Sequence, residues 1–321
     1  MERNLSLDIL RILACVAVIM IHTAGSPIMH GFASPGTMDY NSCLILDALS
    51  RWSVPVFAML TGFFMLNPQK ELSIKKLFSK YILRLLTALV FWSAFYALSL
   101  HMSLYPLGSQ GGHFWYVGMC IGLYLAIPIM RMIAANERLL SYFSWTWFII
   151  KCYQFVGNFT TLPINLQEVL FVDYVGYCLF AYYLKSLTQS KRARIVIYAL
   201  GIAGLAITLI AALWTQNDDT EFFSYTAPNV IVTAMALFTF FMHHPISIKE
   251  SWINAIATIS QCTFGVYLVH IWVLIQIFFR LHRFIPNSLV LCLVCVPMTF
   301  GIGLIIAFVI KKIPFVNKYI I

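Results

Sequence analysis

Charged residues are scarce in this chain of 321 residues: they make up 10% of the sequence, whereas hydrophobic residues make up 61%. A soluble globular domain usually carries about 25% charged residues, because its surface must be hydrated. So low a proportion of charged residues excludes a soluble globular protein. The sequence also lacks long polar and low-complexity segments, so we expect one integral membrane domain over residues 1–321.

Long apolar runs take the place of the missing polar residues. About 20 helical residues cross a hydrocarbon core about 30 Å thick, whereas a membrane β-barrel needs short strands of alternating polarity. The runs here are continuous, so we predict an all-α, polytopic transmembrane bundle with about ten spanning helices. The predicted spans are 7–26, 43–66, 80–101, 114–134, 139–156, 168–186, 193–214, 226–242, 253–279 and 288–310.

The basic residues between the runs predict the orientation. With the N-terminus in the cytoplasm, three of them lie on the outer side, namely Lys151, Arg280 and Arg283. Fifteen lie on the cytoplasmic side: Arg3, Lys70, Lys75, Lys76, Lys80, Arg131, Arg138, Lys185, Lys191, Arg192, Arg194, Lys249, Lys311, Lys312 and Lys318. This asymmetry follows the positive-inside rule and predicts that both termini are cytoplasmic. It also accounts for the net charge of +9, so we expect no nucleic-acid partner.

The eight cysteines do not predict a metal site. Cys292 and Cys295 have the spacing of a metal or redox pair, but they lie inside an apolar run without a second ligand pair nearby. Within such a run, cysteine acts as a small hydrophobic residue. We therefore expect no bound metal.

Three arginines fall inside or at the edge of predicted spans: Arg11, Arg51 and Arg84. An arginine at the centre of a lone spanning helix costs at least about 2.5 kcal/mol, so such residues usually face the interior of a bundle and mark a site. The alternative is that the side chain extends to the interface. That alternative suits Arg84, near a span edge, better than Arg51, about eight residues into its predicted helix.

The first predicted helix carries Asp8, Arg11 and His22. At about 100° per residue, Arg11 and His22 lie within about 20° of one face and about 16 Å apart along the axis. Asp8 precedes Arg11 by three residues and can pair with it. This stripe suits a polar path through the bundle. The alternative is a helix cap at Ser6 or Asp8 and a histidine hydrogen-bonded within the bundle.

Further candidates lie in the outer half of the predicted bundle: His113, Trp115, Tyr267 and His270. Tryptophan and tyrosine are common anchors at a membrane interface, and a lone helical histidine is usually a packed, hydrogen-bonded residue. However, the predicted topology brings His22, His113 and His270 to the same half of the membrane. We therefore treat these residues as candidates for an outer vestibule.

Four stretches of the chain are informative when taken together: Leu7-Asp8-Ile9-Leu10-Arg11 with His22, Ser50 to Pro55 through Thr61-Gly62, His113-Phe114-Trp115-Tyr116 with Tyr124 and Pro128, and Gly265 to His270. In this order they resemble the acyltransferase-three family of integral membrane acyltransferases, whose first helix shows Arg or Lys, ten residues, then His. They resemble in particular bacterial O-acetyltransferases of surface polysaccharides, the enterobacterial common antigen type among them. Thr61 stands where the family usually has Ser.

The resemblance implies acyl transfer, usually of acetyl, from cytoplasmic acyl-CoA to a hydroxyl on the outer side. Acetyl-CoA would be a substrate, with no permanently bound cofactor, and the acceptor a surface or lipid-linked glycan. The phosphates of CoA would be attracted by basic residues at the cytoplasmic rim, for which we expect Arg11, Arg84 and Lys76. The location implied is the plasma membrane, the inner membrane of a bacterium.

We assign His22, Arg51 and Asp8 to the expected catalytic set. Imidazole has an ordinary pKa of about 6.5, which suits a general base acting on the acceptor hydroxyl. Arg51, Trp115 or a backbone N–H would stabilise the oxyanion, and both direct transfer and an acetyl-histidine intermediate remain open. The rival hypotheses are a transporter or flippase, which would also use charged residues within the membrane, and a scaffold or sensor without activity. The sequence predicts no oligomeric state.

Overall fold

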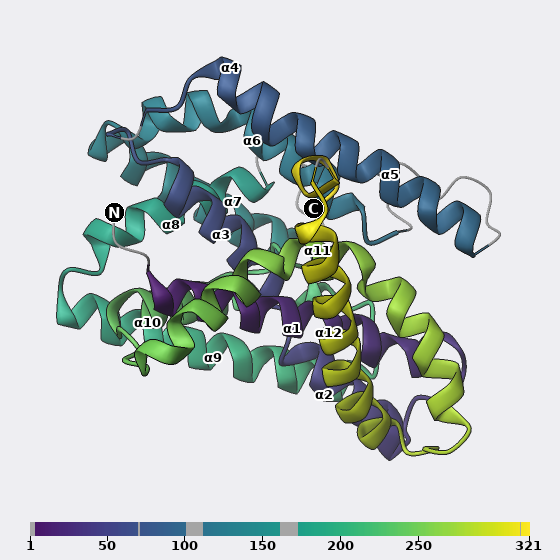
Figure 1. Cartoon of the computed structure of the whole chain (residues 1–321). Coiled ribbons are helices and arrows are strands. Elements are labelled where there is room, and N and C mark those ends of the chain that lie inside the picture. The colour runs from purple at the N-terminus through teal and green to yellow at the C-terminus, as the bar shows by residue number, and fades with distance from the viewer. Residues whose placement is uncertain (1–3, 70, 101–111, 161–172, 315) are drawn as a thin grey trace.

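A computed structural model describes residues 4–69, 71–100, 112–160, 173–314 and 316–321, and every regular element among them is a helix (Figure 1). The predicted all-α class is confirmed. The elements are α1 (Leu5–Met29), α2 (Met38–Ala48), α3 (Ser53–Met65), α4 (Ile74–Lys76), the π-helical turn η1 (Leu77–Ile82), α5 (Leu83–Ser99), α6 (Trp115–Ala134), α7 (Glu137–Gly157), α8 (Asp173–Leu187), α9 (Lys191–Thr215), the 3-10 turn η2 (Glu221–Phe223), α10 (Pro228–His243), α11 (Glu250–His282), α12 (Ser288–Lys312) and α13 (Val316–Tyr319).

Eight helical segments in the described residues are long and apolar enough to cross a membrane. They are Leu5–Met29, Met38–Met65, Ile74–Ser99, Trp115–Ala134, Lys191–Thr215, Glu221–His243, Glu250–His282 and Ser288–Lys312. The other two predicted spans coincide with α7, which is too polar for this class, and α8, whose described part has 15 residues. The first residues of the predicted span 168–186 lie outside the described part. Ten spans therefore stay a prediction.

Helix α1 runs through the middle of the bundle, where it packs against α2, α3, α10, α11 and α12 (Figure 1). The side chain of Asn4 caps its first turn by accepting a hydrogen bond from the Leu7 backbone N–H at 3.1 Å. The buried side chains Leu7, Leu10 and Ala14 join a core shared with α3, α8 and α10. Because α1 is central, polar side chains along it face other helices rather than lipid.

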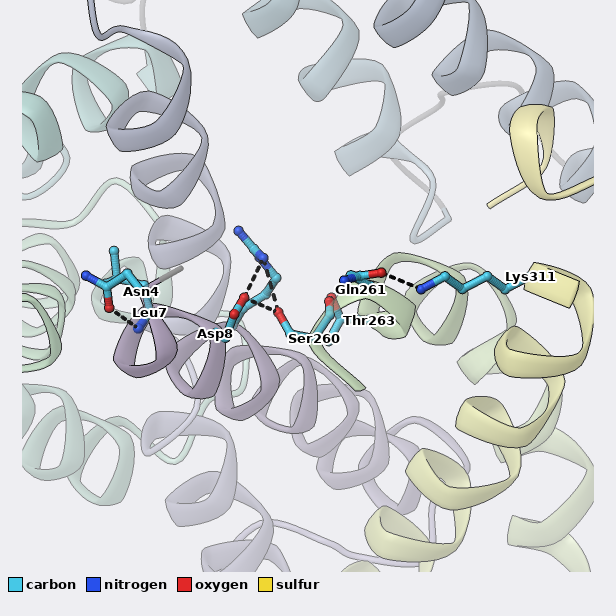
Figure 2. A network of polar contacts seen from close by, with 8 residues as sticks. Asn4, Leu7, Asp8, Ser260, Gln261, Thr263 and Lys311 are labelled. Atoms are coloured by element: carbon cyan, nitrogen blue, oxygen red, sulfur yellow. Dashed lines mark hydrogen bonds and ion pairs between the residues drawn. The ribbon is translucent and has the colours of Figure 1, made fainter. Parts of the chain in front are cut away.

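The end of α10 lies beside the start of α1, and the end of α12 lies beside α11. The Ser6 hydroxyl donates to the His244 carbonyl at the end of α10, and the Ile246 N–H donates to the same hydroxyl at 2.9 Å. Lys311, near the end of α12, donates to Gln261 of α11 (Figure 2). This side of the bundle carries the start of α1 and the ends of α10 and α12, which is the side that the charge pattern predicts to be cytoplasmic.

The predicted helix 43–66 is divided in two, which corrects the sequence-based placement of Arg51. Helix α2 ends at Ala48, α3 begins at Ser53, and Arg51 lies in the turn between them. Pro55 has no N–H to donate into a continuing helix, and it is tolerated in the first turn of α3, where an N–H partner is missing anyway. Instead, the Ser53 N–H donates to the Ser50 carbonyl, which closes a tighter turn.

Candidate functional site

The start of α1 is tied to α11 by a network of three side chains (Figure 2). Arg11 Nη1 donates to Asp8 Oδ1 at 3.2 Å and to Ser260 Oγ at 3.1 Å, and Ser260 Oγ donates to Asp8 Oδ1 at 2.7 Å. The predicted Asp8–Arg11 pair is therefore present. Ser260 was not predicted, because a serine in an apolar helix carries no signal of its partners.

Next to this network lies a cavity of about 390 Å³, here called the arginine cavity. Arg11 and Arg84 both line it, together with Ser260, Gln261 and several aromatic side chains. Arg84 Nε is buried and has no hydrogen-bond partner among the described residues, and the guanidinium lies 5.8 Å from the Phe264 ring centroid. Lys76, the third residue predicted to bind the donor, is exposed and does not line the cavity.

A second cavity of about 30 Å³ surrounds His22, and we call it the histidine cavity. Phe57, Tyr116 and Tyr267 line both this cavity and the arginine cavity. The Tyr116 ring makes edge contacts with Phe57 at 6.1 Å and with Tyr267 at 5.3 Å, so three aromatic rings separate the two spaces. The remaining lining residues are Val18, Val54, His113, Trp115 and Tyr225.

Three histidines meet at the histidine cavity: His22 from α1, His270 from α11, and His113 from the turn before α6. The His22 ring centroid lies 5.1 Å from that of His270 and 6.5 Å from that of His113, and His113 and His270 are 5.1 Å apart. His270 is fully buried; its Nδ1 faces the Tyr267 carbonyl, and its Nε2 has no partner among the described residues. A carbonyl only accepts, so Nδ1 carries the proton, and Nε2 of neutral His270 is an acceptor. No hydrogen bond reaches the His22 ring from the described residues.

A third cavity, of about 380 Å³, lies beyond the histidine cavity and shares Tyr225 with it. We call it the acidic cavity because it is lined by Asp173, Asp218, Asp219 and Glu221. Its other lining residues are Arg51, Tyr174, Thr220, Phe223, Ser224 and Thr226. The shared lining residues place the three cavities in a row, with His22 in the smallest and middle one.

Arg51 lines the acidic cavity rather than the histidine cavity. It forms an ion pair with Asp47, donates to the Phe223 carbonyl at 3.4 Å and lies 4.6 Å from the Phe223 ring centroid. Asp47 was not predicted, although it precedes Arg51 by four residues, because the pairing depends on how the turn between α2 and α3 folds. A second pair, Lys151 with Asp173, joins α7 to the start of α8 beside the same cavity.

The structure thus brings together most of the predicted outer candidates and separates others. His22, His113, Trp115 and Tyr267 line one cavity, and His270 contacts its wall. Asp8 precedes His22 by 14 residues on α1, which is about 21 Å along the axis, so it contacts Arg11 and not the surroundings of His22. Sequence reasoning did not assign Phe57, Tyr225 or Val54 to the site, although Val54 lies in the stretch from Ser50 to Pro55 that resembles the family.

A protein-family model matches most of this chain. Residues 4–308 match the model of the acyltransferase-3 family, which is described as an acyltransferase domain. Neither the comparison with curated proteins nor that with solved structures gives a significant match. The match covers all the cavity-lining residues named above.

Proposed function

Since the chain belongs to the acyltransferase-3 family, we propose that it transfers an acyl group, acetyl above all, from cytoplasmic acyl-CoA to a hydroxyl of a surface or lipid-linked glycan on the outer side. The observation that carries this proposal is the position of His22. It lies in a small cavity between two larger ones, one lined by arginines and the other by carboxylates. Such a row suits two substrates that approach from opposite sides.

The arginine cavity suits the donor. Arg11 and Arg84 offer guanidinium groups to the phosphates of CoA. The Arg84 Nε has no partner among the described residues, and a phosphate oxygen would supply one. The network of Asp8 and Ser260 fixes Arg11, so Asp8 acts as a positioning residue in this proposal. The long, thin pantetheine arm would then extend along the aromatic wall and bring the thioester toward His22.

The reaction follows from the position of His22. Its ring takes the proton of the acceptor hydroxyl, whose oxygen attacks the thioester carbonyl carbon. The C–S bond then breaks, and the proton on the imidazolium passes to the departing CoA sulfur. The His270 ring centroid lies 5.1 Å from that of His22, and its Nε2 has no partner among the described residues, so this nitrogen can accept a His22 N–H as the charge forms.

The developing oxyanion needs a donor at the reacting carbonyl. Trp115 lines the histidine cavity and carries an indole N–H, whereas Arg51 lines the neighbouring acidic cavity and already pairs with Asp47. We therefore favour Trp115 for this role. Arg51 would instead act on the acceptor side.

The acidic cavity suits a neutral or amino-bearing glycan. Its carboxylates can accept hydrogen bonds from sugar hydroxyls, and Tyr174, Phe223 and Tyr225 offer apolar ring faces. Around it the carboxylates of Asp47, Asp173, Asp218, Asp219 and Glu221 outnumber the cations Arg51 and Lys151. This excess disfavours an acceptor that carries many negative charges.

The proposal is tested first by donor binding, which does not require a known acceptor. Thermal stability of the detergent-purified protein is measured with acetyl-CoA, free CoA and an unrelated nucleotide. A ligand at 100 times its dissociation constant stabilises the fold by about 2.7 kcal/mol. We expect both CoA species to stabilise the protein and the nucleotide to have no effect. A folded protein that millimolar acetyl-CoA fails to stabilise would favour the transporter hypothesis instead.

A further inference from the structure

The histidine cavity is much smaller than the cavities on either side of it. Its volume is about 30 Å³, against about 390 Å³ for the arginine cavity and about 380 Å³ for the acidic cavity. A single water molecule needs roughly 10–15 Å³ of such space. The space beside His22 therefore admits a group of only a few heavy atoms.

The walls of this cavity are bulky and largely apolar. Val18 and Val54 are 4% and 5% exposed and belong to the packed core, and Phe57 lies against the same core. Val18 precedes His22 by one turn on α1, so it lies beside the imidazole on the same face. Val54 stands in the first turn of α3, next to Pro55, where the backbone is fixed. These side chains cannot withdraw without disturbing the packing of α1 and α3.

The transfer step restricts what can stand beside His22. A general base must lie about 2.6–3.2 Å from the oxygen whose proton it takes, and that oxygen must lie about 3–3.5 Å from the carbon it attacks. The acyl carbonyl must therefore reach the histidine cavity together with the acceptor oxygen. Whatever is attached to the carbonyl carbon has to fit in the same space.

We infer that the histidine cavity limits the donor to a two-carbon acyl group, with Val54 and Val18 as the residues that set the limit. This inference rests on the proposed function and specifies its donor substrate. We place the size limit at the transfer step, because the arginine cavity, which would hold the donor, is much larger than the histidine cavity. Longer acyl-CoAs are thus expected to bind and to react slowly.

The test compares acetyl-, propionyl- and butyryl-CoA in inverted membrane vesicles, in which the cytoplasmic face is accessible. Release of free CoA is measured, so that resident glycans and water both count as acceptors. One additional methylene in a filled pocket typically changes the specificity constant by about 10–200-fold. We expect acetyl-CoA to react at least about tenfold faster than butyryl-CoA, while both stabilise the purified protein to a similar extent.

Three variants and a matched control test the assignment of the cavity wall. Val54→Ala enlarges the cavity and should raise the butyryl-to-acetyl ratio about fivefold or more, and Val54→Leu should fill it and reduce acetyl transfer without weakening CoA binding. Val56→Ala is the control, because it makes the same truncation on the same helix, while Val56 is fully buried and lines none of the three cavities. In this variant the ratio of butyryl to acetyl transfer should stay unchanged. Val18→Ala repeats the test from α1.

The outcomes separate the inference from the function on which it rests. Butyryl transfer by the wild type within about threefold of acetyl transfer would overturn the size limit and leave the acyltransferase proposal standing. An unchanged ratio in both Val54→Ala and Val18→Ala would do the same. If no acyl-CoA is consumed and none stabilises the folded protein, both the inference and the proposed function fail.

Discussion

The imidazole rings of His22 and His270 lie 5.1 Å apart, although the first belongs to α1 and the second to α11. At this separation, two facing ring nitrogen atoms can come within hydrogen-bond distance. The Tyr267 carbonyl fixes the His270 tautomer, which leaves an acceptor nitrogen in a fully buried ring. If His22 is the base, as proposed, its orientation by His270 would match the arrangement found in many nucleophilic sites.

Replacing His22 should abolish transfer. If His22 is the general base, as proposed, its removal eliminates a contribution that is typically about 10²–10⁴-fold. We expect His22→Gln to lose at least about 100-fold in CoA release from acetyl-CoA, whereas thermal stabilisation by free CoA is retained. Activity within a few-fold of the wild type in a folded variant would refute the assignment of His22 as the base.

The role of His270 can be separated from simple packing by two amides. His270→Asn retains a donor for the Tyr267 carbonyl but has no atom at the position of Nε2. His270→Gln reaches that position and offers a carbonyl acceptor there. If His270 orients His22, Gln should keep at least about fivefold more activity than Asn at equal thermal stability. Equal or reversed activities would mean that the ring serves the fold alone.

Arg84 and Lys76 provide a matched pair for the donor site. Arg84 lines the arginine cavity with a buried Nε that lacks a partner in the described residues, whereas Lys76 is exposed outside it. We expect Arg84→Gln to weaken stabilisation by CoA and to raise KM for acetyl-CoA about tenfold with a smaller effect on kcat. Lys76→Gln removes the same charge and should change KM less than twofold. A larger effect of Lys76 would mean that CoA binds outside the arginine cavity.

The pair of Arg51 and Asp47 should contribute to stability beside the acidic cavity. Removing one member of a buried ion pair leaves the other charge uncompensated, which costs about 3–5 kcal/mol. The Arg51 side chain is 16% exposed, so we expect a loss of stability at the low end of this range, about 3 kcal/mol, for Arg51→Gln. We expect a similar loss for Asp47→Asn. Because the two changes remove the same interaction, the free energy of unfolding should fall much less in the double variant than the sum of the two single losses. Chemical unfolding in detergent measures all three, and additive losses would show that the pair is not coupled.

Close packing of α3 against α8 depends on Gly62. A Cβ on this residue would clash with the Cys178 backbone of α8, which cannot move without shifting the helix. We expect Gly62→Ala to lower the unfolding temperature and the yield of folded protein, since overpacking costs about 1–3 kcal/mol or more. Gly122→Ala in α6 is the control, because no heavy atom lies within 4 Å of its added Cβ. A variant at Gly62 as stable as that control would contradict the close contact.

The sequence by itself determined the environment and the main elements of this protein. Apolar runs too long for a soluble core require lipid, and a backbone in lipid must satisfy its own hydrogen bonds, which leaves helices. Helical periodicity placed Arg11 and His22 on one face of α1. The spacing of three residues between Asp8 and Arg11 predicted their contact, which the structure contains. These are local relationships, set by the geometry of a single helix.

Only the tertiary structure decided which residues from different helices share a site. His22, His113 and His270 come from three separate parts of the chain, and Arg51 lies in a turn that an apolar run does not reveal, where Asp47 pairs with it. The small volume beside His22 depends on how Val18, Val54 and Phe57 pack, and no one helix carries all three. Contacts between helices arise from the shapes of many side chains at once, so periodicity along one helix could not predict them.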